Sequence, residues 1–175
     1  SQPDELLAVR ALFNLAREEL RQENVDLPER MPLGAMIEVP AAAINVRALL
    51  EHADFLAIGT NDLAQYVLAA DRNNDALGDI YNPLQPALLH LIAHVISCAR
   101  RAGKPVSLCG EIAGDVGFTA LLLALGLEEF SMHPAQILQV RDRMATLDHA
   151  RLRRHARRLL RAPTHEAVAP LLDEI

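Results

Sequence analysis

The stretch VSLCGEIAGD, from Val106 to Asp115, places Cys, Gly and Glu directly after a short apolar run that is typical of a strand. The glycine permits a sharp turn there, because it has no Cβ to restrict its backbone. Side chains at the carboxyl end of a buried parallel strand commonly face a ligand. Cys109 is therefore a candidate functional residue, whereas Cys98 falls on the apolar face of a predicted helix and fits a small buried hydrophobe.

The segments on either side repeat an order of strand and helix. Strands are predicted at residues 33–40, 54–62, 104–110 and 128–132. The spacing of apolar residues predicts helices at residues 4–24, 41–53, 63–70, 87–103 and 116–126, and Arg-rich helices close the chain. Near-continuous apolar strands separated by helices indicate an α/β fold with a parallel sheet covered by helices.

This pattern fits either a doubly wound sheet or part of a (βα)8 barrel. No Gly-x-Gly-x-x-Gly follows a predicted strand, so a dinucleotide-binding fold has no support. Barrel enzymes draw one or two site residues from each of several strand ends. The predicted strands end in polar residues of this kind, namely Glu38, Asn61 with Asp62, Cys109 with Glu111, and Ser131 with His133. The strand ends therefore favour the barrel.

Composition narrows the possible functions. Residues 1–175 suit a single domain or a fragment of a larger one, with no linker or repeat. The chain has no apolar run long enough to span a membrane, no signal-peptide pattern and two unrelated cysteines, which favours a cytoplasmic protein.

A net charge of −6 argues against nucleic-acid binding, although residues 141–161 hold eight arginines against two aspartates. We expect that end to be a solvated helix face with Leu152, Leu159 and Leu160 packed inward.

Two carboxylates, Glu38 and Asp62, end successive predicted strands. In parallel topology they converge, and two hard oxygen ligands completed by water and substrate phosphate describe a Mg²⁺ site. The alternative is that Glu38 pairs with an arginine and that Asp62 caps the following helix. Their occurrence together, at neighbouring strand ends, favours the metal.

The remaining candidates suit a phosphorylated or carboxylate substrate. Asn61 supplies a neutral amide beside a metal ligand, and Arg72 can form a forked contact with a phosphate or carboxylate. A thiol, with an ordinary pKa of about 8.5, is mostly protonated at neutral pH, so Cys109 can deliver a proton to carbon. A nucleophilic Cys109 is the weaker interpretation, because no His lies close to it in sequence. His90 and His94, four residues apart, fit a helix surface better than a metal site.

Five segments carry a family resemblance: GAMIEVPAA, DFLAIGTNDLAQYVLAADRNN, YNPLQPALLHLI, SLCGEIAGD and LGLEEFSM. Together they resemble the C-terminal, phosphoenolpyruvate-binding domain of enzyme I of the bacterial phosphotransferase system, from about Leu33 to Met144. Pyruvate phosphate dikinase and phosphoenolpyruvate synthase share much of this pattern, but TNDLAQYVLAADR is most similar to enzyme I.

The resemblance implies the last four βα units of a (βα)8 barrel that binds Mg²⁺ and phosphoenolpyruvate at its strand ends. It implies that Glu38 and Asp62 bind the metal and that Asn61 and Asp62 contact the substrate. It also implies that Arg72 binds the phosphate and that Cys109 protonates the enolate to give pyruvate. In this family the phosphoryl group passes to a His on a separate N-terminal domain and then to an HPr-type carrier, which serves sugar transport or nitrogen regulation. The barrel domain of the family is a homodimer.

The sequence also departs from the family. The phosphorylated His and the strands that carry two further phosphate-binding arginines are absent from these residues, and His133 stands where Ser is usual. We therefore expect the chain alone to be catalytically incomplete, with open sheet edges that a second copy covers. Other possibilities are a dikinase or synthase, a Mg²⁺-dependent lyase of the citrate-lyase type, and a non-catalytic ligand-sensing or dimerisation module.

Overall fold

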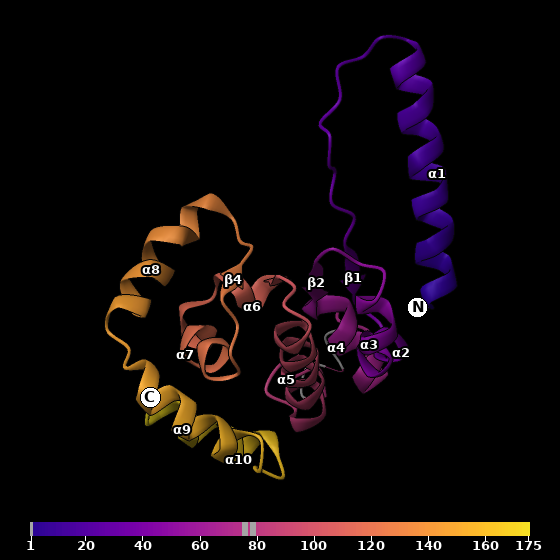
Figure 1. Cartoon of the computed structure of the whole chain (residues 1–175). Helices are drawn as coiled ribbons and strands as arrows, with labels where there is room; N and C mark the ends of the chain where they lie inside the picture. The colour runs from indigo at the N-terminus through magenta and orange to yellow at the C-terminus, as the bar shows by residue number, and fades with distance from the viewer. Residues whose placement is uncertain (1, 75–76, 78–79) are drawn as a thin grey trace.

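The computed structural model describes all residues except 1, 75–76 and 78–79 (Figure 1). The strands are β1 (Ala35–Ile37), β2 (Leu56–Gly59), β3 (Val106–Cys109) and β4 (Glu129–Phe130). The helices are α1 (Pro3–Gln22), α2 (Pro40–Ile44), α3 (Val46–Leu50), α4 (Thr60–Leu68), α5 (Pro86–Arg101), α6 (Glu111–Gly114), α7 (Val116–Ala124), the 3₁₀ helix η2 (Pro134–Gln136), α8 (Ile137–Ala145), α9 (His149–Leu159) and α10 (His165–Asp173). None of the helices in the described residues is long and apolar enough to cross a membrane.

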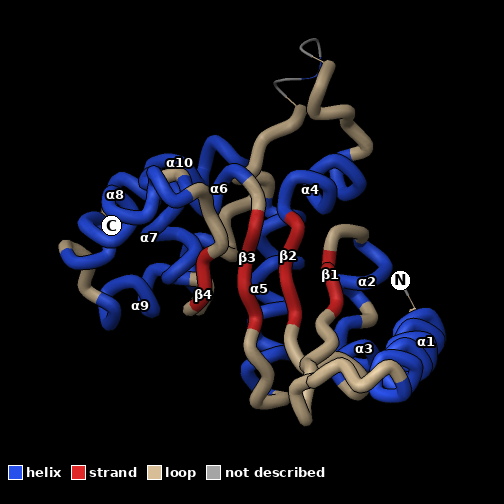
Figure 2. The backbone as a smooth tube through the Cα atoms, turned by 90° about the horizontal axis from the view of Figure 1, so that it is seen from above, coloured by secondary structure: helices blue, strands red, loops and turns tan. Residues whose placement is uncertain are grey.

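The four strands form one parallel sheet in the order β1-β2-β3-β4 (Figure 2). Each strand is joined to the next through helices, and α4 and α6 begin where β2 and β3 end. The carboxyl ends of the strands therefore lie at one edge of the sheet. This confirms the predicted fold class, an α/β chain whose four successive parallel βα units are arranged as in half of a (βα)8 barrel.

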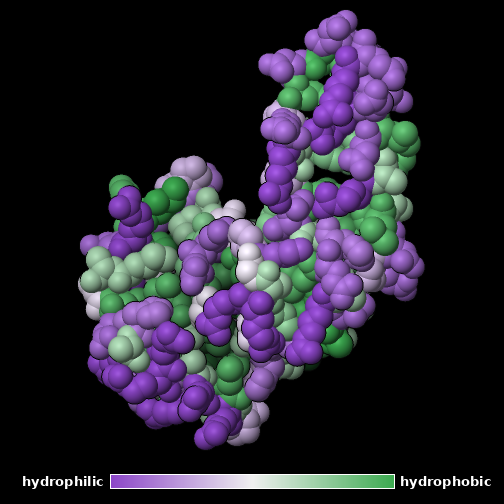
Figure 3. Space-filling model, in the orientation of Figure 1, coloured by the Kyte–Doolittle hydropathy of each residue, from purple (hydrophilic) through white to green (hydrophobic). Residues whose placement is uncertain are grey.

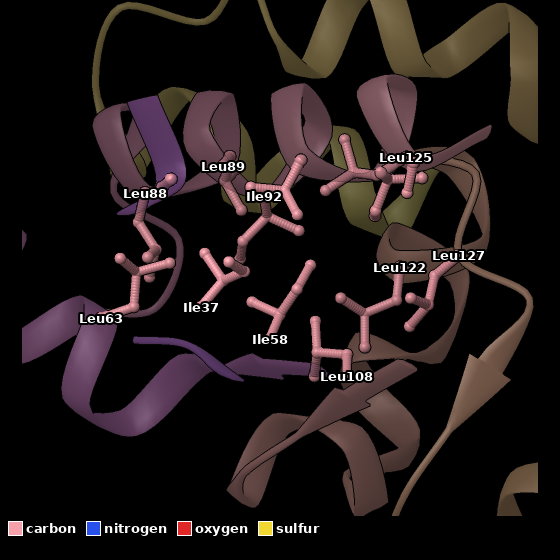
Figure 4. Close-up of a cluster of buried hydrophobic side chains, with 14 of the residues drawn as sticks. Ile37, Ile58, Leu63, Leu88, Leu89, Ile92, Leu108, Leu122, Leu125 and Leu127 are labelled. Atoms are coloured by element: carbon pink, nitrogen blue, oxygen red, sulfur yellow. The ribbon is translucent and has the colours of Figure 1, made fainter. Parts of the chain in front are cut away.

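One face of the sheet carries the hydrophobic core. Ile37, Ile58 and Leu108 lie side by side in the strand register and are fully buried. They point toward Leu88, Leu89 and Ile92 of α5, and Leu122 and Leu127 continue the same cluster (Figure 4). Cys98, 3% exposed on α5, belongs to this core, as predicted. Burial of large aliphatic side chains contributes about 1.5–3 kcal/mol each, so the cluster fixes the strand ends relative to one another.

The opposite face of the sheet is less apolar than the face that packs against α5. Because side chains alternate along a strand, Met36, Ala57, Ser107 and Glu129 lie together in the register on the face away from α5. Met36 is the large apolar side chain in this row, and it is 47% exposed. The strands therefore place their branched side chains on the face that packs against α5.

Three predicted elements differ in their bounds. The helix predicted at residues 41–53 is two short helices, α2 and α3, divided at Asn45. The strand predicted at 128–132 is paired over only two residues, Glu129 and Phe130. The strand predicted at residues 54–62 ends at Gly59, and α4 begins at Thr60 instead of at the predicted residue 63. As a result, Asn61 and Asp62 lie in the first turn of a helix.

The N-terminal helix α1 projects from the body as an arm, and residues 23–34 run back beside it (Figure 1). The spacing of apolar residues predicted this helix, and Leu6 is its buried residue. Leu12 is 66% exposed and Leu15 61% exposed. The space-filling view shows hydrophobic side chains on the surface of the arm (Figure 3). Part of the apolar face of α1 is therefore exposed to solvent.

Asp54 ties the arm to the body. Its carboxylate accepts hydrogen bonds from the backbone N–H of Leu33, at 2.8 Å, and from Arg10 of α1, at 3.1 Å, and Arg30 lies 3.4 Å away. The Leu33 hydrogen bond and the two arginines lower the pKa of Asp54 to about 2. Because the pKa is lowered by folding, the stabilisation is present above the ordinary pKa of about 3.9 and is lost as the pH falls toward 2.

We expect Asp54→Asn to lower the melting temperature at pH 7. Between about pH 4 and pH 2 the native chain should lose stability as the Asp54 carboxylate is protonated, and Asp54→Asn should show little of this loss. Thermal melts at several pH values measure both effects. Glu128→Gln, at an exposed residue with no hydrogen bond or ion pair in the described part of the chain, is the control. Parallel melting curves for Asp54→Asn and the native chain across this pH range would contradict the assignment.

The Arg-rich end is a structural unit. Leu152 and Leu159 of α9 are buried and Leu160 packs against the core, as predicted. Arg158 forms a bidentate contact with Glu174, at 2.5 and 3.0 Å, and Arg151 donates to the backbone oxygen of the same residue. Several of the arginines therefore hold α9 against α10, which agrees with an interpretation of this segment as a solvated helix face.

Candidate active site

The predicted site residues come together at the carboxyl edge of the sheet. Glu38, Asn61, Asp62, Arg72 and Cys109 all line one shallow pocket of about 180 Å³. Glu38 follows β1, Asn61 and Asp62 begin α4 after β2, and Cys109 ends β3. The remaining lining residues are Met36, Gly59, Thr60 and Gly110. The fold thus joins residues that are up to 71 positions apart, from Glu38 to Cys109, in one place.

Glu38 reaches across from β1 toward the end of β2. A Cβ added to Gly59 would lie 3.2 Å from Glu38 Oε2 and 3.0 Å from its Cβ, which is closer than side-chain packing normally allows. The missing side chain of Gly59 therefore makes room for this carboxylate. Within the described residues no ion pair or hydrogen bond engages the Glu38 side chain, so the alternative of an arginine partner is wrong.

Asp62 occupies the first turn of α4, where a negative charge interacts favourably with the helix dipole. Its carboxylate does not cap the helix, since Gly59 is the N-cap residue. In the part of the chain that the structure describes, Asp62 forms no ion pair. Two carboxylates without a cationic partner thus line the same pocket, which is an arrangement that suits a bound cation.

Cys109 lies at the pocket wall between its neighbours. Its thiol is placed to donate to the carbonyl oxygen of Ile58, at 3.5 Å, and its sulfur lies 3.8 Å from that of Met36. Burial raises the pKa of the Cys109 thiol and the nearby Glu38 carboxylate raises it further, against an opposing backbone hydrogen bond. A protonated thiol suits an acid better than a nucleophile. No His lines this pocket among the described residues.

Arg72 enters the pocket from the segment that follows α4. Its backbone N–H donates to the side chain of Gln65, at 3.4 Å, and its guanidinium is exposed. Tyr81, farther along the same segment, donates its hydroxyl to the backbone carbonyl of Asn61, at 3.0 Å. Burial raises the pKa of Tyr81, with the carboxylates of Glu111 and Asp62 adding to the effect and Arg72 opposing it. The hydrogen bond from Tyr81 to Asn61 attaches the segment that follows α4 and contains Arg72 to the site.

Other candidates from the strand ends do not reach this pocket. Ser131 and His133 follow β4 but are absent from its lining, and His133 instead caps η2 by accepting from the N–H of Ala135 at 3.2 Å. His90 is exposed and His94 lies beside Cys98 on α5, as expected for a helix surface. Sequence reasoning missed Thr60, Tyr81 and Met36, because their contacts depend on chain segments that are distant in sequence.

Comparison with known proteins shows the family to which the chain belongs. The family model described as "PEP-utilising enzyme, PEP-binding domain" matches residues 1–149, and the chain belongs to that family. The match confirms the resemblance found from about Leu33 to Met144 and extends it through the N-terminal helix.

Three relatives that match most of the chain carry one name. Phosphoenolpyruvate-protein phosphotransferase of Cupriavidus necator is 44% identical over 165 residues, which is 94% of this chain and 28% of the relative. The protein of the same name from Streptococcus equinus is 42% identical over 171 residues, 97% of this chain and 30% of the relative. That from Haemophilus influenzae is 36% identical over 171 residues, 98% of this chain and 30% of the relative. The chain thus spans less than a third of the length of these curated relatives.

Proposed function

We propose that this chain forms part of a phosphoenolpyruvate–protein phosphotransferase, in which it binds phosphoenolpyruvate and releases pyruvate. The observation that supports this most directly is the pocket that gathers Glu38, Asn61, Asp62, Arg72 and Cys109. The three relatives described above carry the name phosphotransferase, which favours this activity over a dikinase or a lyase.

The donors in the pocket fit Mg²⁺. Glu38 and Asp62 are hard oxygen ligands, and neither side chain has a cationic partner in the described structure. The described residues contain no group of three or more His, Cys, Asp or Glu that could hold a metal, so the rest of the shell falls to water and substrate oxygens. This is the usual manner of Mg²⁺ binding in phosphate-dependent enzymes. When bound, the ion supplies charge that stabilises the enolate and the phosphate oxygens.

The other residues act on the two ends of the substrate. Arg72 binds the phosphate with its guanidinium, and Asn61 donates from its amide to a substrate oxygen. When the phosphoryl group passes to its acceptor, its bond to the enol oxygen breaks and the electron pair of that bond stays on the enolate. The Cys109 thiol then donates its proton to the terminal carbon, which gives pyruvate and leaves a thiolate. The raised pKa keeps that proton on Cys109 until the enolate forms.

The phosphoryl group then requires an acceptor outside this chain. We propose a His on a separate N-terminal domain and, after it, an HPr-type carrier protein. Replacing the matching residues of the Cupriavidus necator relative with this chain gives a hybrid enzyme in which the proposal can be tested. We expect Mg²⁺-dependent release of pyruvate from phosphoenolpyruvate. Lack of pyruvate release by a folded hybrid enzyme that still binds its carrier would contradict the proposed function.

A second prediction concerns the isolated chain, which we expect to dimerise and to bind phosphoenolpyruvate more weakly than millimolar. In the described structure β1 and β4 each pair on one side only, and Leu12 and Leu15 are exposed on α1. Open edges and exposed leucines favour association with a second copy. Sedimentation measures the mass, and Leu12→Gln with Leu15→Gln tests the contribution of the arm. A stable monomer at all concentrations, or micromolar binding of the substrate, would contradict this expectation.

A further inference from the structure

Glu111 follows the strand that ends in Cys109, and the proposed reaction gives it no part. Two hydrogen bonds nevertheless join this residue to Asn61. The backbone N–H of Glu111 donates to Asn61 Oδ1 at 3.2 Å, and Asn61 Nδ2 donates to Glu111 Oε1 at 3.4 Å. One residue therefore holds both ends of the Asn61 amide.

These contacts determine which group Asn61 offers to a ligand. An asparagine amide has one carbonyl oxygen and two N–H donors. Glu111 occupies the oxygen and one donor, which leaves the second N–H of Asn61 unused by it. A flipped amide would place the carbonyl oxygen against the Glu111 carboxylate and the NH₂ group against a backbone N–H. Both contacts would be repulsive, so Glu111 selects the amide orientation.

The backbone around this pair is fixed by close packing. Gly110 has a φ of 117°, a conformation that favours glycine, and a Cβ there would lie 2.3 Å from Thr60 Oγ1 and 2.9 Å from Asn61 Oδ1. Thr60, 2% exposed, donates its hydroxyl to the carbonyl oxygen of Cys109 at 3.1 Å. The turn after β3 thus packs against the start of α4, which places Glu111 beside Asn61.

We propose that Glu111 is a positioning residue that orients the Asn61 amide so that its free N–H donates to a substrate oxygen. This inference rests on the proposed function for the identity of the substrate. Glu111 acts through Asn61, and its carboxylate belongs to a neighbouring hollow of about 230 Å³ formed with Tyr81, Asp115 and Phe118. The same contacts tie the turn that carries Cys109 to the helix that carries Asp62.

The test is a double-mutant cycle in the hybrid enzyme. We expect Glu111→Ala to lower kcat/KM for phosphoenolpyruvate by about tenfold, the effect of losing one hydrogen bond to a charged partner. Glu111→Gln retains an acceptor for Asn61 Nδ2, so it should recover most of that loss. In an Asn61→Ala background, Glu111→Ala should have no further effect, because the residue through which it acts is gone. Glu128→Ala, which removes an exposed carboxylate outside both pockets of the site, serves as the control.

A second readout does not require activity. In ¹⁵N spectra of the 175-residue chain, we expect the side-chain NH₂ signals of Asn61 to be dispersed, to collapse toward those of a free asparagine in Glu111→Ala, and to persist in Glu111→Gln. Unchanged Asn61 signals in Glu111→Ala, or equal losses from Glu111→Ala with and without Asn61, would overturn the proposal. If the unsubstituted hybrid enzyme releases no pyruvate, the proposed function fails, while these spectra still decide whether Glu111 orients Asn61.

Discussion

Glu38→Gln and Asp62→Asn are each expected to lower Mg²⁺-dependent pyruvate release by the hybrid enzyme by about 10³-fold or more. In the proposed site each change removes one of two proposed ligands of a metal ion; such an ion stabilises charge by several kcal/mol, and every 1.36 kcal/mol corresponds to tenfold in rate. The two side chains line the same pocket and have no cationic partner in the described residues, so neither has a structural ion pair to lose.

The measurement is the rate of pyruvate formation as a function of Mg²⁺ concentration. A weakened metal site should demand more Mg²⁺ for half-maximal rate in both variants. Glu128→Gln, matched in charge and exposed at the other end of the sheet, should leave both the rate and the Mg²⁺ dependence unchanged. Melting temperatures close to that of the unsubstituted protein would show that the fold is intact. A native rate in either site variant would contradict its assignment as a metal ligand.

Cys109→Ala is expected to lower pyruvate release by about 10²–10⁴-fold, the range that a general acid contributes. Binding of phosphoenolpyruvate should be almost unchanged, because in the proposed reaction the thiol acts only after the enolate has formed. In the described structure the Cys109 thiol makes only long contacts, at 3.5 Å to the Ile58 carbonyl and 3.8 Å to the Met36 sulfur, so its removal disturbs little structure. Comparing kcat with the dissociation constant of the substrate separates the two effects.

Cys98→Ala is the matched control for Cys109→Ala, because it removes the second of the two cysteines, which is buried on α5 away from the pocket. It should lower the melting temperature through lost packing and leave the turnover number unchanged. Cys109→Ser tests acidity further, since a hydroxyl of similar size is a much weaker acid and should not restore the rate. A native turnover number in Cys109→Ala would contradict the proposed acid.

The sequence predicted the order of the elements and the convergence of the site well. Apolar strands followed by polar residues define both the parallel sheet and its functional edge, because strand direction alone brings Glu38, Asp62 and Cys109 together. These are properties of local pattern and topology, which a single sequence records. The start of α4 at Thr60 was not predicted, because residues 60–62 were included in the preceding strand and Thr, Asn and Asp favour turns and first helical turns alike.

The features that the sequence did not predict depend on contacts between distant segments. The hydrogen bonds from Tyr81 and Glu111 to Asn61 join residues 20 and 50 positions apart, and no periodicity reports them. The exposure of Leu12 and Leu15 was not predicted either. A regular apolar spacing indicates one face of a helix, but it does not show whether another part of the chain covers that face. The glycine at position 110 predicted a sharp turn, and the structure shows in addition that Thr60 lies too close for a side chain at this position.

The central claim is that Glu38 and Asp62 hold a divalent ion beside Cys109, and NMR of the isolated chain with Mn²⁺ tests it most directly. Mn²⁺ accepts the same oxygen ligands as Mg²⁺ and broadens nearby signals even when it binds weakly. We expect broadening of the signals of Glu38, residues 59–62 and residues 109–110, strengthened by phosphoenolpyruvate and abolished in Asp62→Asn. Broadening centred elsewhere, for example on Glu128 and Glu129 at the other end of the sheet, or left unchanged in Asp62→Asn, would contradict the account.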